Sequence, residues 1–446
     1  MTLVADLELP AFDHTDSSMR GERFHAAMEQ LRATGWLAQT PYGYMVLDRE
    51  AGEFFLRTRS AIFPGMKIAE IFGVSEGPLF EEMKRNILHI NGADHSRLRS
   101  LVNPALSPRA VERYRPAMRG FLERLFDETV AAGAGEGEGE PAGASPGTTV
   151  ACEFVESFAK PYPSLVIAEV MGAPLADAPR LHHWSNWIQR QFDAGSMAAE
   201  RDGIERAVEE FYAYASELVM ARRSDPRDDL ISKLIAAEEM DAHPPRLTDV
   251  ECINLVFNVL VGGVDTSQSQ LAHSIRLLAE NPDQWRALAR DPTLADAAVE
   301  ESLRYEPITP FTARILVEDV SFRDVTFPKG TIVMVCAFTG NRDLEGGGDG
   351  GSAEGGDPAG GNPAAGDAYR GGERFDITAD RGGARALTFG AGVHYCLGAN
   401  LARLELQEGL AFLATHMNDL QLDGEPEFGT ISGIYGLERL PVRFTV

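Results

Sequence analysis

Apolar residues recur at intervals of three and four positions along most of this chain, which is the pattern of amphipathic helices. The pattern is clear in residues 21–35, where a glycine follows the last apolar turn, and again in residues 109–133. Helical patterns return between residues 150 and 223. The spacing of apolar positions therefore predicts a mainly α-helical protein.

The longest helix is expected between residues 248 and 281. Thr248 and Glu251 have the spacing of a capping box, and Asn281 followed by Pro282 provides a stop signal. A helix of about 33 residues would be roughly 50 Å long at about 1.5 Å per residue. Such a helix must cross the whole molecule.

Alternating apolar positions and turn residues between 317 and 338 predict a small β-region, and residues 440–446 are typical of a final strand. Two glycine-rich segments, 132–147 and 345–373, have too few apolar residues to fold, so we expect surface loops there. We find no internal repeats. The sequence therefore predicts one domain over residues 1–446, mainly α with small β-sheets.

The chain has 446 residues and a formal net charge of −26. This charge argues against nucleic acid and anionic membranes as partners, because both need a basic surface. We find no run of about twenty apolar residues, as a transmembrane helix would require. The acidic start lacks the basic and apolar regions of a signal peptide. We therefore expect a cytoplasmic protein that binds neither nucleic acid nor membranes.

The four cysteines are far apart and form no CxxC pair, so a disulfide framework is not expected. Cys152, Cys252 and Cys336 lie in apolar runs and are most simply small core residues. Cys396 instead lies in the glycine-rich stretch GAGVHYCLG, and a helical pattern begins directly after it. The start of a helix stabilises a thiolate, so Cys396 is either a metal ligand or, like most lone cysteines, a buried residue.

The full pattern around Cys396 is F-G-x-G-x-H-x-C-x-G, which is far more specific than a lone cysteine. It resembles the haem-binding loop of the cytochrome P450 superfamily, in which the cysteine thiolate is the axial iron ligand. The resemblance implies haem b as cofactor, Cys396 as iron ligand, and the P450 fold with a long central helix crossing the haem. The residues of the pattern are Phe389, Gly390, Gly392, His394, Cys396 and Gly398.

The segment VGGVDTSQSQ, residues 261–270, lies in the middle of the predicted long helix. Gly262 and Gly263 each cost about 1 kcal/mol relative to alanine in a helix interior. A flat ligand against the helix would explain them, and a harmless irregularity is the alternative. The segment resembles the family's [AG]-G-x-[DE]-T-[TS] element at every position. The resemblance implies that Asp265 and Thr266 deliver protons to dioxygen at the iron.

Glu301 and Arg304 in EESLRYEP are three residues apart and therefore adjacent on a helix. An ordinary surface ion pair, worth under about 1 kcal/mol, is the alternative. In this place before the cysteine, the pair resembles the family's ExxR element, which binds an arginine of the loop preceding the haem motif. The resemblance implies Arg381 as this third member.

His95 and Arg99 are spaced i, i+4 in GADHSRLRSLV, and Arg314 lies at the start of the predicted β-region. A solvated pair on a helix surface is the commoner outcome for such spacing. The family resemblance implies instead that these three residues and His394 bind the two haem propionates through charge-assisted hydrogen bonds.

The resemblance spans roughly residues 85 to 440 and implies a monooxygenase that inserts one oxygen atom from O2 into an apolar small organic substrate. We find no nicotinamide or flavin domain, so electrons would come from separate proteins. In soluble bacterial members these are usually a ferredoxin and its reductase, with NAD(P)H as ultimate donor, and Arg385 and Arg403 are candidate docking residues. We expect a monomer. The family places the substrate against Val259, Gly262, Ile308, Thr309, Phe311, Ile434 and Tyr435.

Two other classes of function remain open. One is a haem-thiolate enzyme that uses peroxide, or that rearranges or couples its substrate. Asp265 and Thr266 argue against the peroxide route, because that route needs no proton delivery to O2. The other class is a non-catalytic haem protein, which is less favoured because nothing in the sequence resembles an output domain. The adjacent His182 and His183 make a poor metal pair, because neighbours on a helix point about 100° apart.

Overall fold

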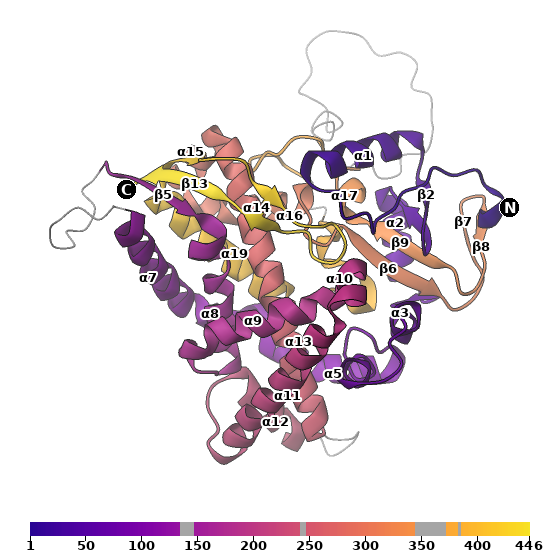
Figure 1. The fold of residues 1–446 in the computed structure, drawn as a ribbon, viewed down its shortest axis with the longest axis horizontal. Helices are drawn as coiled ribbons and strands as arrows, with labels where there is room; N and C mark the ends of the chain where they lie inside the picture. The colour runs from indigo at the N-terminus through magenta and orange to yellow at the C-terminus, as the bar shows by residue number, and fades with distance from the viewer. Residues whose placement is uncertain (134–146, 241–246, 344–371, 382–384) are drawn as a thin grey trace, which may run out of the picture.

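The structure, a computed structural model, describes residues 1–133, 147–240, 247–343, 372–381 and 385–446. Within these residues the chain is mainly helical with four small sheets, as the sequence predicts (Figure 1). The two glycine-rich segments predicted to be loops lie almost entirely outside the described residues.

The helices largely begin and end where the capping and stop signals predict. Thr248 and Glu251 form the predicted capping box, with the Glu251 N–H donating to Thr248 Oγ1 at 3.2 Å. The long helix ends at Glu280, and Pro282 opens the next one. The helices are α1 Gly21–Thr34, α2 Arg49–Arg57, α3 Met66–Ile71, α4 Pro78–Met83, α5 Gly92–Val102, α6 Pro108–Val111, α7 Arg115–Gly133, α8 Pro161–Met171, α9 Ala178–Gln189, α10 Ala194–Ala199, α11 Arg201–Ser224, α12 Leu230–Met240, α13 Asp249–Gly263, α14 Asp265–Glu280, α15 Pro282–Arg290, α16 Ala295–Tyr305, α17 Ala337–Gly340 and α19 Ala399–His416.

The largest sheet has five strands in the order β2-β3-β9-β6-β4, with β3 parallel to β9. Arg314 of β6 is paired in register with Val333 of β9. The β-region predicted between residues 317 and 338 is confirmed as β7, β8 and β9. The strands are β1 Thr2–Leu3, β2 Leu37–Thr40, β3 Gly43–Val46, β4 Ala61–Ile62, β5 Thr149–Glu153, β6 Phe311–Leu316, β7 Val320–Phe322, β8 Val325–Phe327, β9 Ile332–Cys336, β10 Asn418–Leu422, β11 Glu427–Phe428, β12 Leu437–Arg439 and β13 Pro441–Thr445.

Residues 149–153 correct the expectation that helices begin at residue 150. They form β5, which pairs antiparallel with the C-terminal strand β13. Because that partner is distant in the sequence, local periodicity does not report it. Cys152 lies on this strand and is half-buried, whereas Cys252 and Cys336 are buried core residues as predicted.

The long central helix runs through the middle of the molecule (Figure 1) and packs against α8, α9, α11, α16 and α19. It is interrupted at Val264, so that it consists of α13 and α14 rather than one continuous helix. By length and composition, residues Asp249–Glu280 form the one described helix able to cross a membrane. Of its most apolar window, 67% is buried inside the protein, as in a core helix.

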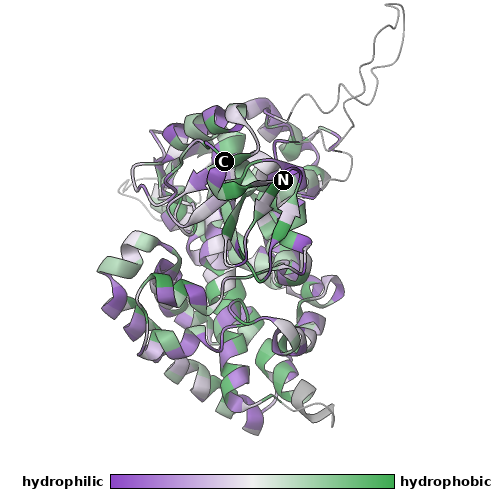
Figure 2. Cartoon of the chain, turned by 90° about the vertical axis from the view of Figure 1, so that its right-hand side faces the viewer, coloured by the Kyte–Doolittle hydropathy of each residue, from purple (hydrophilic) through white to green (hydrophobic). Residues whose placement is uncertain are grey.

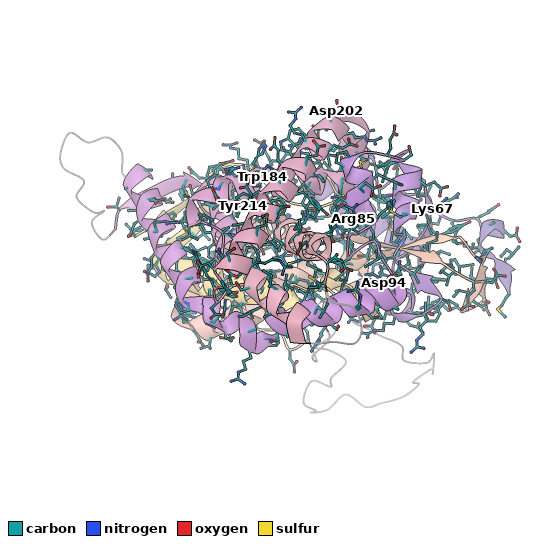
Figure 3. The ribbon with its side chains drawn as sticks, turned by 90° about the horizontal axis from the view of Figure 1, so that it is seen from below. Lys67, Arg85, Asp94, Trp184, Asp202 and Tyr214 are labelled. Carbon is teal, nitrogen blue, oxygen red and sulfur yellow. The ribbon has the colours of Figure 1, made fainter. Side chains whose placement is uncertain are left out.

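Hydrophobic and hydrophilic residues alternate along the helices, as expected for helices that bury one face (Figure 2). α9 packs on α11 through Trp184 and Tyr214, whose ring centroids are 5.1 Å apart (Figure 3). The Trp184 indole N–H also donates to Glu210 at 2.9 Å. These contacts fix α9 alongside α13 and thereby position the α9 side chains that reach the central helix.

Candidate functional site: the cysteine loop and the broken helix

The cysteine loop is held in a fixed shape by tight backbone turns. Gly390 has φ 68° and Gly392 has φ 72°, a region that favours glycine. A Cβ atom on Gly392 would also lie 2.5 Å from the Leu56 carbonyl oxygen of α2. The Cys396 N–H donates to the Phe389 carbonyl at 2.9 Å, which closes the loop just before α19. The glycines of the motif therefore shape the loop that presents Cys396.

The thiol of Cys396 lies at the start of α19 and is half-buried. Burial raises the pKa of this thiol, while hydrogen bonds from the backbone N–H groups of Gly398 and Ala399 and the positive charges of Arg99 and Arg403 oppose that rise. These groups stabilise a thiolate, which is the form that binds a metal. Two backbone N–H groups and two arginines therefore partly offset the effect of burial at this sulfur.

The break in the central helix lies at the predicted glycine pair. Thr266 Oγ1 donates to the Gly262 carbonyl at 2.6 Å, and Gln189 of α9 donates to the Val261 carbonyl. Gly262 is exposed, and a Cβ atom added to it would meet nothing within 4 Å. A Cβ atom on Gly263 would instead lie 2.3 Å from the Ile167 side chain of α8. Gly262 therefore faces open space, while Gly263 allows close helix packing.

The Asp265 side chain points towards α9. Its carboxylate accepts hydrogen bonds from the Ser185 hydroxyl and, at 3.2 Å, from Asn186 Nδ2, both on α9. Burial raises the pKa of Asp265, and the hydrogen bond from Ser185 and the nearby His182 only partly oppose the rise. The sequence singled out Asp265 and Thr266 but missed Ser185 and Asn186, because no local signal marks them.

Glu301 joins Arg304 and Arg381 in one buried cluster, as the resemblance implies. Arg304 donates both Nε and Nη2 to the Glu301 carboxylate at 2.7 and 2.8 Å. Arg381 donates to the same carboxylate at 2.7 and 3.2 Å. The Asp376 N–H adds a further hydrogen bond at 2.8 Å. This network connects α16 to the segment that precedes the cysteine loop.

Four basic side chains gather beside the cysteine loop. The rings of His95 and His394 have centroids 4.2 Å apart, and His394 Nε2 lies 3.0 Å from Asn91 Oδ1. Arg99 donates to the Tyr395 carbonyl, next to Cys396. Arg314 is 2% exposed and donates to the Ala313 carbonyl at 2.9 Å. The structure therefore brings together the four residues proposed to bind carboxylates.

In the part of the chain that the structure describes, no carboxylate forms an ion pair with Arg99 or Arg314. The thiolate form of Cys396 favours the charge of Arg99. Burial alone lowers the pKa of Arg314 to about 10, and burial with the positive charges of His95, Arg314 and Arg99 lowers that of His394 to about 3. Buried cations without partners are costly. Two carboxylates of a bound haem would balance these charges, so the residues present fit that cofactor.

The residues expected around the substrate differ in their exposure. Thr309, Phe311 and Ile434 are partly exposed, whereas Val259 and Ile308 are 9% and 6% exposed. The Tyr435 ring is fully buried and stacks on Phe428, with 6.0 Å between the ring centroids. It therefore contributes to the aromatic core.

The histidine pair set aside in the sequence does not form a metal site in the structure. His182 Nε2 lies 2.9 Å from Gln268 Oε1 of α14. Within the described ranges, no group of three or more histidine, cysteine, aspartate or glutamate side chains is arranged to hold a metal ion.

Comparison with known proteins supports this description of the site. The cytochrome P450 family model matches residues 178–345. Luteothin monooxygenase of Streptomyces thioluteus is 31% identical over 441 residues, which cover 98% of this chain and 96% of that protein. Cytochrome P450 107B1 of Saccharopolyspora erythraea is 32% identical over 407 residues, covering 89% and 86% of the two chains. The crystal structure of CalO2 has a TM-score of 0.81 at 26% identity and covers 98% of this chain and 99% of that one.

These relatives are named monooxygenases or P450 proteins, and the match extends over nearly the whole chain. The family implies a haem-thiolate iron cofactor, which the cysteine loop and the basic cluster fit. The chain therefore belongs to the cytochrome P450 family of monooxygenases.

Proposed function

We propose that this enzyme inserts one oxygen atom from O2 into an apolar small organic molecule, using haem b and electrons from a ferredoxin and its reductase. The observation that carries the proposal is the buried, unpaired basic cluster beside Cys396, which a cofactor with two carboxylates balances. When bound, the haem supplies the redox chemistry that activates O2. The side chains of this chain hold the cofactor and move protons.

In this proposal, Cys396 ligates the iron through its sulfur, and the four basic residues hold the propionates. The backbone N–H groups of Gly398 and Ala399 bond to the sulfur and moderate its electron donation. Glu301 with Arg304 and Arg381 keeps the preceding segment in place. The cofactor is thus anchored at its iron and at its acidic edge by separate parts of the chain.

Thr266 and Asp265 move protons in this proposal. The Thr266 hydroxyl donates to the Gly262 carbonyl, so its oxygen remains able to accept a hydrogen bond from a bound molecule. Asp265 is bound to Ser185 and Asn186, so its carboxyl must rotate away from α9, or act through a water molecule, to supply Thr266. Proton delivery therefore depends on how firmly α9 holds Asp265.

Exposed arginines near the cysteine loop support the proposal that the electron-donor protein is negatively charged. Arg57, Arg59 and Arg385 are exposed, and none has an ion-pair partner among the described residues. Arg57 adjoins the loop, since its Cα lies 3.4 Å from a Cβ atom placed on Gly392. Arg403, the other expected docking residue, is instead bound to Glu300. The proposal keeps the expectation of a single-domain monomer in the cytoplasm.

Coupled turnover with and without the Thr266 hydroxyl tests the proposal. A compound that shifts the haem from low to high spin would serve as substrate, with a ferredoxin, its reductase and NADPH. Thr266→Ala should lower product formed per NADPH by roughly tenfold or more, because a proton donor is lost. Turnover driven by peroxide should remain.

The matched control is Ser274→Ala, since Ser274 makes the same type of hydrogen bond, to Gln270 on the same helix, at 2.8 Å. Cys396→Ser should abolish the thiolate spectrum with carbon monoxide. Unchanged coupling in Thr266→Ala would favour the peroxide route instead, and an unchanged spectrum in Cys396→Ser would contradict the ligand assignment.

A further inference from the structure

One stripe of the central helix, which includes Gly262, is exposed. Between residues 254 and 266, Asn258, Gly262 and Thr266 are at least partly exposed, and Gly263 is the other residue that is not buried. Residues four apart lie on one face of a helix. Asn258 is therefore on the same face as Gly262, one turn or about 6 Å further along the axis.

The orientation of the Asn258 amide is determined by its neighbours. Its Nδ2 donates to Asn254 Oδ1 at 3.0 Å and to the Asn254 carbonyl at 2.7 Å. Asn254 Nδ2 in turn donates to the Tyr212 hydroxyl at 2.7 Å. Because an amide nitrogen only donates, this chain of bonds directs the nitrogen of Asn258 towards Asn254 and its oxygen away.

The buried carboxyl group of Glu82 extends this hydrogen-bond network. Glu82 of α4 is 1% exposed and accepts a hydrogen bond from Asn86 Nδ2. Burial raises the pKa of Glu82 to about 8, although hydrogen bonds from Asn86 and Asn254 oppose the rise. The network links α4, α11 and α13, so the Asn254 amide is held by several elements.

The remaining polar atom of this network is Asn258 Oδ1. Among the described residues, no donor bonds to it. An amide oxygen accepts up to two hydrogen bonds, and the open space at Gly262 is the place that a ligand would occupy. The network therefore presents one oriented acceptor on the exposed stripe of Asn258, Gly262 and Thr266, whereas Val259, Leu260 and Val261 are buried.

We propose that Asn258 is a specificity-determining residue whose amide oxygen accepts a hydrogen bond from a hydroxyl or N–H group of the substrate. The inference rests on the proposed function and narrows its substrate class. The preferred substrate is an apolar molecule that carries a donor group about one helical turn from the carbon to be oxidised. A site built to bond a donor discriminates against an analogue that lacks it, because the acceptor is then covered by the bound analogue and left unpaired.

Imidazoles with an alkyl tail test this inference without turnover. In 1-(ω-hydroxyalkyl)imidazoles the ring nitrogen binds the haem iron, and the tail carries a hydroxyl to a distance set by its length. Their methyl ethers are matched probes that have no donor. Dissociation constants would be measured from the shift of the haem absorption band, with tails of about four to ten carbons.

For the wild type we expect one tail length at which the hydroxyl probe binds about three- to tenfold more tightly than its ether, the range of one hydrogen bond. Asn258→Leu should remove this preference, because the amide acceptor is lost. Val250→Asn is the matched control, because Val250 lies on the same helix and is 45% exposed at the surface. It should leave the preference unchanged.

The outcomes separate this inference from the proposed function. A wild type with no hydroxyl preference at any tail length, or an Asn258→Leu variant that keeps the preference, would overturn the role of Asn258. Absence of any imidazole shift and of the thiolate spectrum with carbon monoxide would instead overturn the haem-thiolate assignment itself.

Discussion

Two groups of arginines adjoin the cysteine loop, and they differ in their partners. Arg304 and Arg381 share the carboxylate of Glu301, which is 4% exposed. The half-buried Arg99 and the buried Arg314 donate to backbone carbonyls instead, and no carboxylate of the described chain is bound to them. The first group is balanced by the polypeptide, and the second is not.

The difference shows which part of the site the polypeptide completes alone. Burying a charge costs several kcal/mol unless a partner compensates it, roughly 3–5 kcal/mol when one partner of a buried pair is removed. The Glu301 group avoids this cost in the folded chain. The Arg314 group carries the cost until carboxylates of a bound cofactor arrive, so cofactor binding and local stability are coupled there.

The largest effect is expected from unbalancing the first group. Glu301→Gln should lower the free energy of unfolding by about 3–5 kcal/mol, because Arg304 and Arg381 would remain buried without a counter-charge. Chemical denaturation measures this change. The matched control is Glu300→Gln, since Glu300 pairs with Arg403 while its side chain is 44% exposed. The control should cost under about 1 kcal/mol, and equal losses in both variants would contradict the contrast.

A smaller change in the free energy of unfolding, of opposite sign, is expected from removing the positive charge of Arg314. Arg314→Leu should raise the free energy of unfolding of the cofactor-free protein by about 1–3 kcal/mol, because a poorly satisfied buried group is lost. The same variant should release haem faster to apomyoglobin, since a propionate partner is gone. Exposed Arg290 provides the control, and Arg290→Leu should change neither quantity. Lower stability of cofactor-free Arg314→Leu would show that Arg314 is already compensated.

The smallest effect concerns the buried carboxyl of Glu405, which forms no ion pair with a described residue. Glu405 is 1% exposed, accepts from Ser267 at 2.8 Å, and burial raises its pKa to about 8. Between its ordinary pKa, about 4.5, and about 8, the folded chain holds a proton that the unfolded chain releases. The free energy of unfolding should therefore fall as the pH rises through this window, by at most about 1.4 kcal/mol between pH 6 and 7.

Glu405→Gln isolates this contribution, because the amide cannot titrate. The variant should show a shallower fall of stability between pH 6 and 7 than the wild type, measured by urea denaturation at both values. Parallel curves for the two proteins would show that Glu405 does not take up a proton on folding.

Features governed by neighbouring residues in the sequence were predicted well. The capping box of Thr248 and Glu251 and the helix stop before Pro282 depend on local geometry, so the sequence reports them directly. The contact of Arg381 with Glu301 was predicted only through the family resemblance, because the two residues are 80 positions apart. Composition and periodicity alone carry no information on such a pair.

Features governed by tertiary packing were predicted poorly. The sequence identified Asp265 but not its direction, because α9 supplies the two donors that bind its carboxylate. Local periodicity likewise does not show that the Tyr435 ring stacks on Phe428 and contacts Phe24. The sequence did not single out Asn258, because its role depends on a hydrogen-bond network that spans three helices.

The neighbouring glycines 262 and 263 are required for different reasons. At Gly263 a side chain would displace Ile167, which is 1% exposed in the core, so the position is constrained by the architecture. At Gly262 a side chain would enter open space, where it would compete with a bound molecule rather than with the protein itself. Enlarging residue 263 should therefore weaken the fold, whereas enlarging residue 262 should weaken binding.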